Sequence, residues 1–279
     1  MPITPNELSR AAATLAYYLN QAGVTFSISG GAAGSLLRQW YNMERRATDD
    51  IDLVVQPDNN FNAETISKWL YETYPDAFSK KTVYGVSLPT LVFVKDDGSK
   101  VHIDIEIFDV GAWPQRPQYD LSNATNERIT VTVDGVSVPI FGATWQLREK
   151  IVTAYERQGS NKERTDLDDA EVLLDLVQDN VLDLTQHEEA VRHFVTKRPG
   201  SRRLLQLKVY CPAVLGDPWT WYEEARVYFR FEGNIPKYLD ETLRCHDLKW
   251  DKDNGVYYLT SATGLVFWVN EAYQLVRWT

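Results

Sequence analysis

Cysteine is scarce in this chain: Cys211 and Cys245 are the only two among 279 residues. Two cysteines are too few for a disulfide framework or a cysteine-based zinc site. The sequence also lacks any apolar run approaching the roughly 18 residues that a membrane helix needs. Its first residues show no basic stretch followed by an apolar one, so they do not match a secretory signal. These absences predict a soluble, cytoplasmic protein that does not associate with membranes.

An excess of basic residues is lacking as well, because 29 Lys and Arg face 39 Asp and Glu, for a net charge of −10. This balance argues against non-specific coating of duplex nucleic acid, since that affinity comes from neutralising phosphates. One segment, residues 197–208, departs from it by holding basic residues and no acid. We interpret this segment either as a solvated hinge between domains or as a path that guides an RNA backbone.

A helix opens the chain, because Thr4, Pro5 and Glu7 fit the N-cap, N1 and N3 positions of a capping box. Short β-rich runs predict strands further on, and Asp134-Gly135 predicts a hairpin. No internal repeat is apparent. The expected strands cover residues 24–29, 51–55, 91–94, 101–108, 128–133 and 136–140, and the expected helices cover 5–22, 32–43, 62–73, 144–177 and 185–196.

This succession of elements predicts an α+β fold with a mixed sheet. From about residue 200 the sequence becomes rich in Trp and Tyr, and its last 25 residues predict three short strands. Aromatic side chains in such strands either form a core or stack on the bases of a nucleic acid. We therefore expect three parts: a catalytic core at 1–142, a helical segment at 143–198 and a small aromatic β-rich unit at 199–279.

Two carboxylates stand at the start of the buried strand. Period-two alternation puts Asp50 and Asp52 on one side of this strand and Ile51 on the other. Two carboxylates about 7 Å apart on one strand stay ionised more easily with a cation between them. Their hard oxygens suit Mg²⁺ or Mn²⁺, although a D-x-D pair at a strand end is also common as a solvated pair.

A later strand adds further acids. Alternation in residues 101–108 places His102, Asp104 and Glu106 on one face and isoleucines on the other. Taken alone, this segment also fits an edge strand with a charged outer face. Beside Asp50 and Asp52, it predicts a metal site of three carboxylates, of which the third accepts a proton from an attacking hydroxyl.

Gly30-Gly31 lies between a strand and a helix. Glycines at this place let backbone N–H groups approach a phosphate at the helix N-terminus. The chain has neither GxGxxG nor GxxxxGK[ST], which argues against a dinucleotide fold and a P-loop enzyme.

The glycine pair, followed by Arg-Ala-Thr-Asp-Asp-Ile-Asp at 46–52, resembles the signature of the nucleotidyltransferase superfamily that includes DNA polymerase β. AbiEii-type toxin nucleotidyltransferases are the relatives that it resembles most. The resemblance covers about residues 20–180 and implies that residues 1–142 form the nucleotidyltransferase core. It implies that the catalytic metal ligands are Asp50, Asp52 and Asp104, with Glu106 as the alternative third acid, and that Gly30, Gly31, Arg46 and Thr48 bind nucleotide.

Residues 145–174 resemble the helix pair of the same family, in which a lysine faces the nucleotide. By position, Lys150 would bind the triphosphate, and Asp166 and Asp169 would match the family's D-x-x-D. Alternatively, Lys150 is a surface lysine paired with Glu149 or Glu171, and the two aspartates cap and orient a helix.

The resemblance implies a transferase that moves an NMP from an NTP, ATP included, to an acceptor hydroxyl with release of pyrophosphate. Mg²⁺ or Mn²⁺ would be the cofactor. The acceptor would be an RNA 3′ end such as that of tRNA, a protein side chain or a small molecule. The alternative is a non-catalytic nucleotide-binding or scaffolding protein that keeps the fold.

Overall fold

The computed structural model describes residues 3–83, 86–240, 242–270 and 272–278. The chain forms two compact units, Met1–Gln146 and Leu147–Thr279. Within the described ranges, no helix combines the length and apolar character that crossing a membrane requires. The division into three parts stays a prediction.

A seven-stranded mixed sheet forms the first unit and confirms the predicted α+β class. The β2–β5 and β1–β7 pairs are parallel, and the other neighbouring strands are antiparallel. In order across the sheet, the strands are β3 (Phe78–Val83), β4 (Val86–Val94), β5 (Lys100–Asp109), β2 (Asp50–Val55), β1 (Phe26–Ser29), β7 (Val136–Phe141) and β6 (Arg128–Val133).

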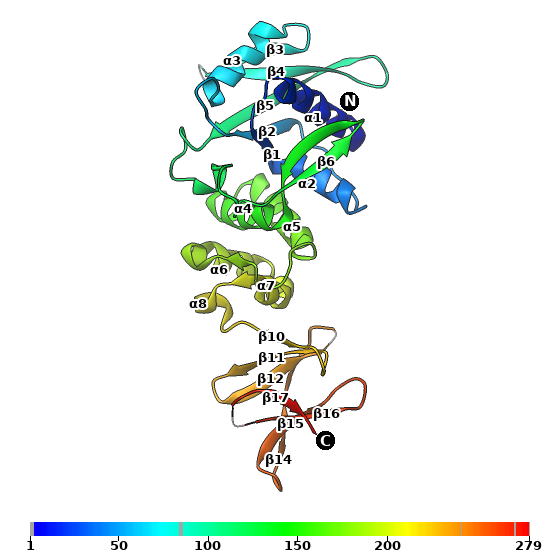
Figure 1. Cartoon of the computed structure of the whole chain (residues 1–279), viewed down its shortest axis with the longest axis vertical. Helices are drawn as coiled ribbons and strands as arrows, with labels where there is room; N and C mark the ends of the chain where they lie inside the picture. The colour runs from blue at the N-terminus through cyan, green and yellow to red at the C-terminus, as the bar shows by residue number, and fades with distance from the viewer. Residues whose placement is uncertain (1–2, 84–85, 241, 271, 279) are drawn as a thin grey trace. The chain divides into compact units, whose positions relative to one another are not determined.

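Three helices, α1 (Pro5–Gln21), α2 (Gly30–Trp40) and α3 (Ala63–Thr73), pack on this sheet (Figure 1). The capping box predicted for α1 is present, because the Thr4 hydroxyl accepts from the Glu7 N–H and the Glu7 carboxylate accepts from the Thr4 N–H. The short 3₁₀ helix η1 (Pro117–Tyr119) lies between β5 and β6. The helices bury their apolar faces through Leu8, Leu15, Leu19, Leu36, Leu37, Ile66 and Leu70.

Strand β3 is absent from the strands predicted by the sequence. It pairs antiparallel with β4, which starts earlier than the predicted strand at 91–94. The segment Phe-Ser-Lys-Lys-Thr-Val has weak apolar alternation, and pairing with β4 overrides its low strand propensity. This strand matters for the site, because it carries Lys81.

The second unit begins within a helix, since the boundary at Leu147 lies inside α4. The predicted helical stretch 144–177, broken at 159–162, appears as α4 (Ala143–Glu156) and α5 (Asn161–Leu174). The predicted helix at 185–196 appears as η2 (Thr185–His187) and α6 (Glu188–Lys197). The remaining elements before the aromatic strands are β8 (Leu182–Asp183), η2 (Thr185–His187), α6 (Glu188–Lys197), η3 (Pro199–Ser201), α7 (Arg202–Lys208), β9 (Val209–Tyr210) and α8 (Pro212–Leu215).

The aromatic part consists of two successive four-stranded antiparallel meanders, coloured orange to red in Figure 1. The three strands predicted at the end of the chain are β15 (Val256–Thr260), β16 (Val266–Val269) and β17 (Leu275–Arg277), but the sequence did not predict that the whole arrangement occurs twice. The first meander contains β10 (Thr220–Tyr222), β11 (Val227–Glu232), β12 (Ile235–Leu239) and β13 (Cys245–Asp247), and the second contains β14 (Lys249–Asp251), β15 (Val256–Thr260), β16 (Val266–Val269) and β17 (Leu275–Arg277).

Candidate active site

The parallel pairing of β2 with β5 brings the predicted acids side by side. Asp50 lies opposite Asp104, and Asp52 lies opposite Glu106. Neighbouring strands are about 4.8 Å apart, and residues in register share a face of the sheet. The alternate residues, including Ile51 and Ile105, are fully buried on the other face. Four carboxylates from two neighbouring strands therefore share one face of the sheet.

Gly30 allows the Asp52 carboxylate to approach the start of α2. Asp52 pairs with Ser29 across β1 and β2, and Gly30 follows directly with a φ of +62°. A Cβ built on Gly30 would lie 1.7 Å from Asp52 Oδ2, so no larger residue fits without displacing the carboxylate. Because the first N–H groups of a helix are unsatisfied, this edge also favours negatively charged groups.

Thr48 orients the other aspartate. Its hydroxyl donates to Asp50 Oδ1 at 2.5 Å. A Cβ on Gly31 would lie 3.0 Å from the Thr48 Cβ, so the glycine allows the threonine to pack closely. The structure thus brings Gly30, Gly31 and Thr48 together with the two aspartates, while the partly buried Arg46 lies in the segment that leads into β2.

Asp104 has two further partners that the sequence did not predict. The Lys81 ammonium on β3 donates to Asp104 Oδ2 at 2.5 Å, and the Thr90 hydroxyl on β4 donates to Asp104 Oδ1 at 3.4 Å. His102, predicted on the same face, contacts the Ser79 hydroxyl at 3.3 Å through Nδ1. The β-branched residues Thr82 and Val83 were the one signal of a strand that could have pointed to Lys81.

The donor set fits a hard divalent cation, since it offers carboxylate oxygens on one face beside a threonine hydroxyl. The described part of the chain holds no group of three or more His, Cys, Asp or Glu side chains that converges on a metal position. Asp50, Asp52 and Asp104 are thus neighbours in the sheet, and their role as ligands stays a prediction.

In the second unit, Lys150 joins the two helices that the sequence predicted. Its ammonium lies 2.7 Å from Asp166 Oδ1 and 3.1 Å from Asp169 Oδ2. The side chains of Lys150 and Asp166 are only 13% and 3% exposed, and Arg157 adds a contact of 3.1 Å to Asp166. The partners are therefore the D-x-x-D carboxylates rather than Glu149 or Glu171.

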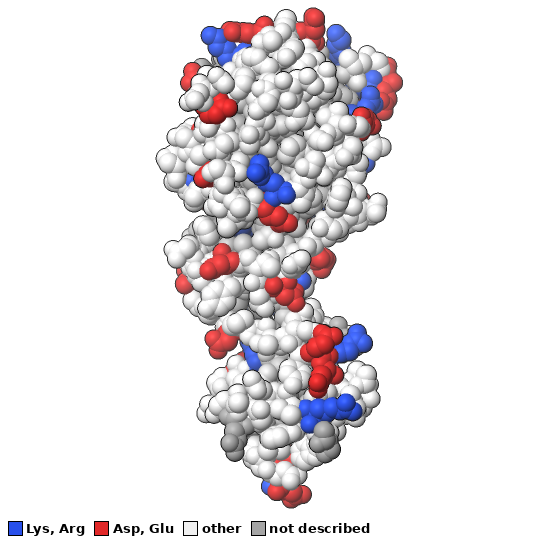
Figure 2. Space-filling model, in the orientation of Figure 1, with Lys and Arg blue, Asp and Glu red and all other residues white. Residues whose placement is uncertain are grey.

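The basic segment 197–208 is folded and ion-paired rather than a solvated hinge. Helix α7 buries Leu205 and Leu207. On the face shown in Figure 2, acidic and basic side chains are interspersed. The contacts of the segment include Lys197 with Glu163, Arg198 with Asp168 and Glu171, Arg202 with the Val214 carbonyl, Arg203 with the Trp219 ring, and Lys208 with Asp179.

In the first unit, a mixed sheet thus sets two aspartates of one strand beside a glycine-initiated helix, with two more acids on the neighbouring strand. The family model described as "Nucleotidyl transferase AbiEii toxin, Type IV TA system" matches residues 22–242. The chain therefore belongs to the AbiEii nucleotidyltransferase family. This match extends beyond the predicted range of 20–180 and ends before the second meander.

A solved structure gives the same class. The crystal structure of an antigenic nucleotidyltransferase-like protein from Paracoccidioides brasiliensis is 34% identical to this chain, with a TM-score of 0.70. The match covers 78% of this chain and 100% of that one. No curated protein matches the chain. The family and the structural neighbour together support the prediction that this protein is an enzyme, a nucleotidyltransferase.

Proposed function

We propose that this enzyme moves an NMP from an NTP to an acceptor hydroxyl, with the 3′ end of an RNA such as tRNA as the acceptor. The observation that carries the proposal is the register that sets Asp50 beside Asp104 at the edge where Gly30 begins α2. The acceptor assignment rests on Trp278 of the aromatic part, which is 41% exposed and offers a stacking surface to a base.

The reaction forms a bond between the acceptor oxygen and the α-phosphorus and breaks the bond from that phosphorus to the β-phosphate. The pyrophosphate leaves with the electron pair of the broken bond. Asp104 accepts the proton of the attacking hydroxyl, because it lies next to Asp50 in the register. The backbone N–H groups at Gly30-Gly31 bind a phosphate, as unsatisfied helix N-termini do, with Thr48 beside Gly31. Arg46 is a further nucleotide-binding candidate through the family resemblance.

Mg²⁺ or Mn²⁺, held by Asp50, Asp52 and Asp104, would neutralise the charge that develops on the phosphates. Lys150, Asp166 and Asp169 remain nucleotide-binding candidates through the family resemblance, and the ion pairs between α4 and α5 also explain their presence. The proposed substrate is an NTP, with ATP among the candidates. The proposed place of activity is the cytoplasm.

The test incubates the whole chain with Mg²⁺ or Mn²⁺, each α-³²P-labelled NTP in turn, total RNA and cell extract. We expect label on RNA, and a loss of about 10²–10³-fold for Asp50→Asn and Asp52→Asn, because each loses charge that is needed in the transition state. Asp49→Asn is the matched control, since this neighbouring aspartate is exposed.

Full labelling by Asp52→Asn with an unchanged melting temperature would contradict the proposed site. Label on protein or on a small molecule would keep the transfer reaction and exclude RNA as the acceptor. If NTPs raise the melting temperature of the wild type in Mg²⁺ but no product carries label, the non-catalytic binding protein is the correct alternative.

A further inference from the structure

The two meanders of the aromatic part repeat the same strand arrangement, with a longer turn between the second and third strands of the second copy. Trp221 pairs across the sheet with Tyr228, and Trp250 pairs in the same way with Tyr257. The ring centroids of these two pairs are 4.8 Å and 4.7 Å apart. The turns before the last strands also match, since Leu243 and Tyr273 have φ values of 60° and 59°. The second meander is therefore a second copy of the first.

The first meander packs against a different partner on each of its two faces. One face of the first meander, with Tyr228 and Leu239, packs on Leu207 and Trp219 from the preceding segment. Its opposite face, with Phe229, packs on the second meander. The core between the meanders contains Ala225, Val227, Phe229, Leu248, Leu259, Phe267 and Leu275.

In this head-to-tail stacking, one face of the second meander has no further meander on it within the described residues, and its side chains are partly or largely exposed. The open face, as we call it, consists of Val256, Tyr258, Trp268 and Trp278. These residues lie on one side of the sheet. Tyr258 pairs with Trp268 across the strands, and the backbone N–H of Trp278 donates to the Val266 carbonyl. In the first meander the residue equivalent to Trp278 is Leu248, which is 5% exposed, whereas Trp278 is 41% exposed.

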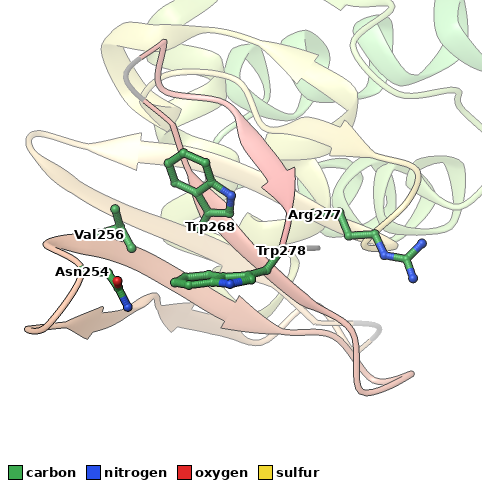
Figure 3. A pocket seen from close by; sticks show the side chains of 5 residues that line it. All are labelled: Asn254, Val256, Trp268, Arg277 and Trp278. Carbon is green, nitrogen blue, oxygen red and sulfur yellow. The ribbon is translucent and has the colours of Figure 1, made fainter.

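Two further residues at or beside the open face differ in chemistry from their equivalents. Asn254 stands where the first meander has Ala225, and Arg277 stands where it has Asp247. A shallow pocket of about 390 Å³ gathers these substitutions, since it is lined by Asn254, Val256, Trp268, Arg277 and Trp278 (Figure 3). Asn254 therefore replaces an apolar residue. Arg277 replaces an acid on the edge strand β17, where it pairs with Phe267 and so alternates away from Trp278.

The polar groups lie at opposite ends of this pocket. In Figure 3 the Trp268 ring stands over the flat Trp278 ring, with Asn254 on one side and Arg277 on the other, its guanidinium directed away from the two rings. The two indole centroids are 6.4 Å apart at an angle of 67°, so the rings do not cover each other face to face. Arg277 has no ion pair or hydrogen bond to a side chain within the described ranges, and the Asn254 amide donates to Asp251 at 2.8 Å, which leaves its Oδ1 as an acceptor.

We propose that the open face binds one nucleotide of a single-stranded RNA. The base stacks on Trp278, the Asn254 Oδ1 accepts a hydrogen bond from a base amino group, and Arg277 pairs with a phosphate. A flat aromatic surface beside a cation suits a base and its phosphate, whereas an apolar protein partner would leave Arg277 and Asn254 without a role. The inference deepens the proposed function, because it rests on RNA as the acceptor.

The test measures binding of the whole chain to a fluorescein-labelled single-stranded RNA of mixed sequence by anisotropy at several salt concentrations. We expect Trp278→Ala to weaken binding about tenfold, since a stacked base is lost. Arg277→Gln should lower the slope of log Kd against log salt by about 0.7, the value for one phosphate contact on a single strand.

Trp250→Ala is the matched control, because Trp250 is 51% exposed in the same meander but does not line the pocket. The control should bind RNA as tightly as the wild type. Equal affinity of Trp278→Ala and the wild type would overturn the inference. Absence of RNA binding would also overturn the inference when it is combined with one of two results. These are a Trp278-dependent self-association and a Trp278-dependent affinity for a proline-rich peptide.

The labelling assay separates this inference from the proposed function. If the wild type binds RNA through Trp278 yet places no label on RNA, the proposed acceptor is wrong and the RNA-binding face stands. If RNA is labelled and Trp278→Ala neither weakens binding nor raises the KM for RNA, the transfer reaction stands and the open face is not its RNA site.

Discussion

Gly30 is the residue on which the geometry of the aspartates depends most directly. A side chain at this position would occupy the place of the Asp52 carboxylate, and its φ of +62° is unfavourable for any residue with a Cβ. Gly30→Ala should therefore abolish measurable transfer and destabilise the protein by more than the ~1–2 kcal/mol of the left-handed backbone alone. The measurements are label incorporation and urea unfolding.

Gly98→Ala is the control for backbone strain, because Gly98 has a φ of +80° and a Cβ added there would meet open space, with nothing within 4 Å. Gly98→Ala should lower the free energy of unfolding by about 1–2 kcal/mol and leave nucleotidyl transfer unchanged. Equal effects of both substitutions on activity would show that contact with Asp52 is unimportant.

At the residue scale, much of the candidate site could be predicted. Alternation along each strand was enough to put Asp50 with Asp52, and Asp104 with Glu106, because side chains on a strand alternate strictly. The contact between Lys81 and Asp104 could not be predicted, since it depends on the pairing of β3 and β4 beside β5. A choice between Asp104 and Glu106 as the third carboxylate also requires the register of β2 against β5.

At the scale of elements, Lys150 on α4 links this helix to α5 through ion pairs. Its ammonium neutralises Asp166 and Asp169, both nearly buried. Lys150→Met should destabilise the protein by about 3 kcal/mol, because removing one partner leaves buried charges uncompensated. Equilibrium unfolding in urea measures the change. A role in nucleotide binding would add a rise in the KM for NTP, which the more conservative Lys150→Arg should reduce.

Lys68→Met is the matched control, since Lys68 and Glu72 form an exposed pair on α3 with a separation of 3.8 Å. Exposed pairs contribute about 0.5 kcal/mol or less, so this variant should unfold almost as the wild type does. If Lys150→Met lowered the free energy of unfolding as little as this control, the interpretation of the ion pairs as a stabilising link between α4 and α5 would be wrong.

Local signals decided which elements could be predicted. The capping box of α1 and the Asp134-Gly135 hairpin each depend on neighbours within a few residues, and both appear in the structure. Strand β3 has no comparable local signal. The repeat of the meanders was also missed, because the two copies share turn conformations and the positions of Trp and Tyr rather than a run of identical residues.

At the scale of the whole molecule, each unit has a core of its own. Phe267 is fully buried between the two meanders, in a cluster that contains no residue of the first unit. Phe267→Ala should cost about 3–5 kcal/mol through lost contacts and a cavity. Hydrogen exchange should show lost protection in β15 and β16 and unchanged protection in β2 and β5.

Ile235→Ala is the control for this substitution, since Ile235 is 48% exposed in the first meander. Its effect on protection should be small. Loss of protection in β2 and β5 after Phe267→Ala would show that the two units unfold together.

Local patterns in the sequence were enough to predict the fold class and the enzyme class of this protein. Alternation, glycine placement and the motif at 46–52 each depend on neighbouring residues, so they predicted the α+β class, the paired aspartates and the nucleotidyltransferase family. Folding decided what depends on contacts between distant segments. It set Asp50 beside Asp104 through parallel pairing, assigned Lys150 to Asp166 and Asp169, and stacked two meanders so that one aromatic face remains open.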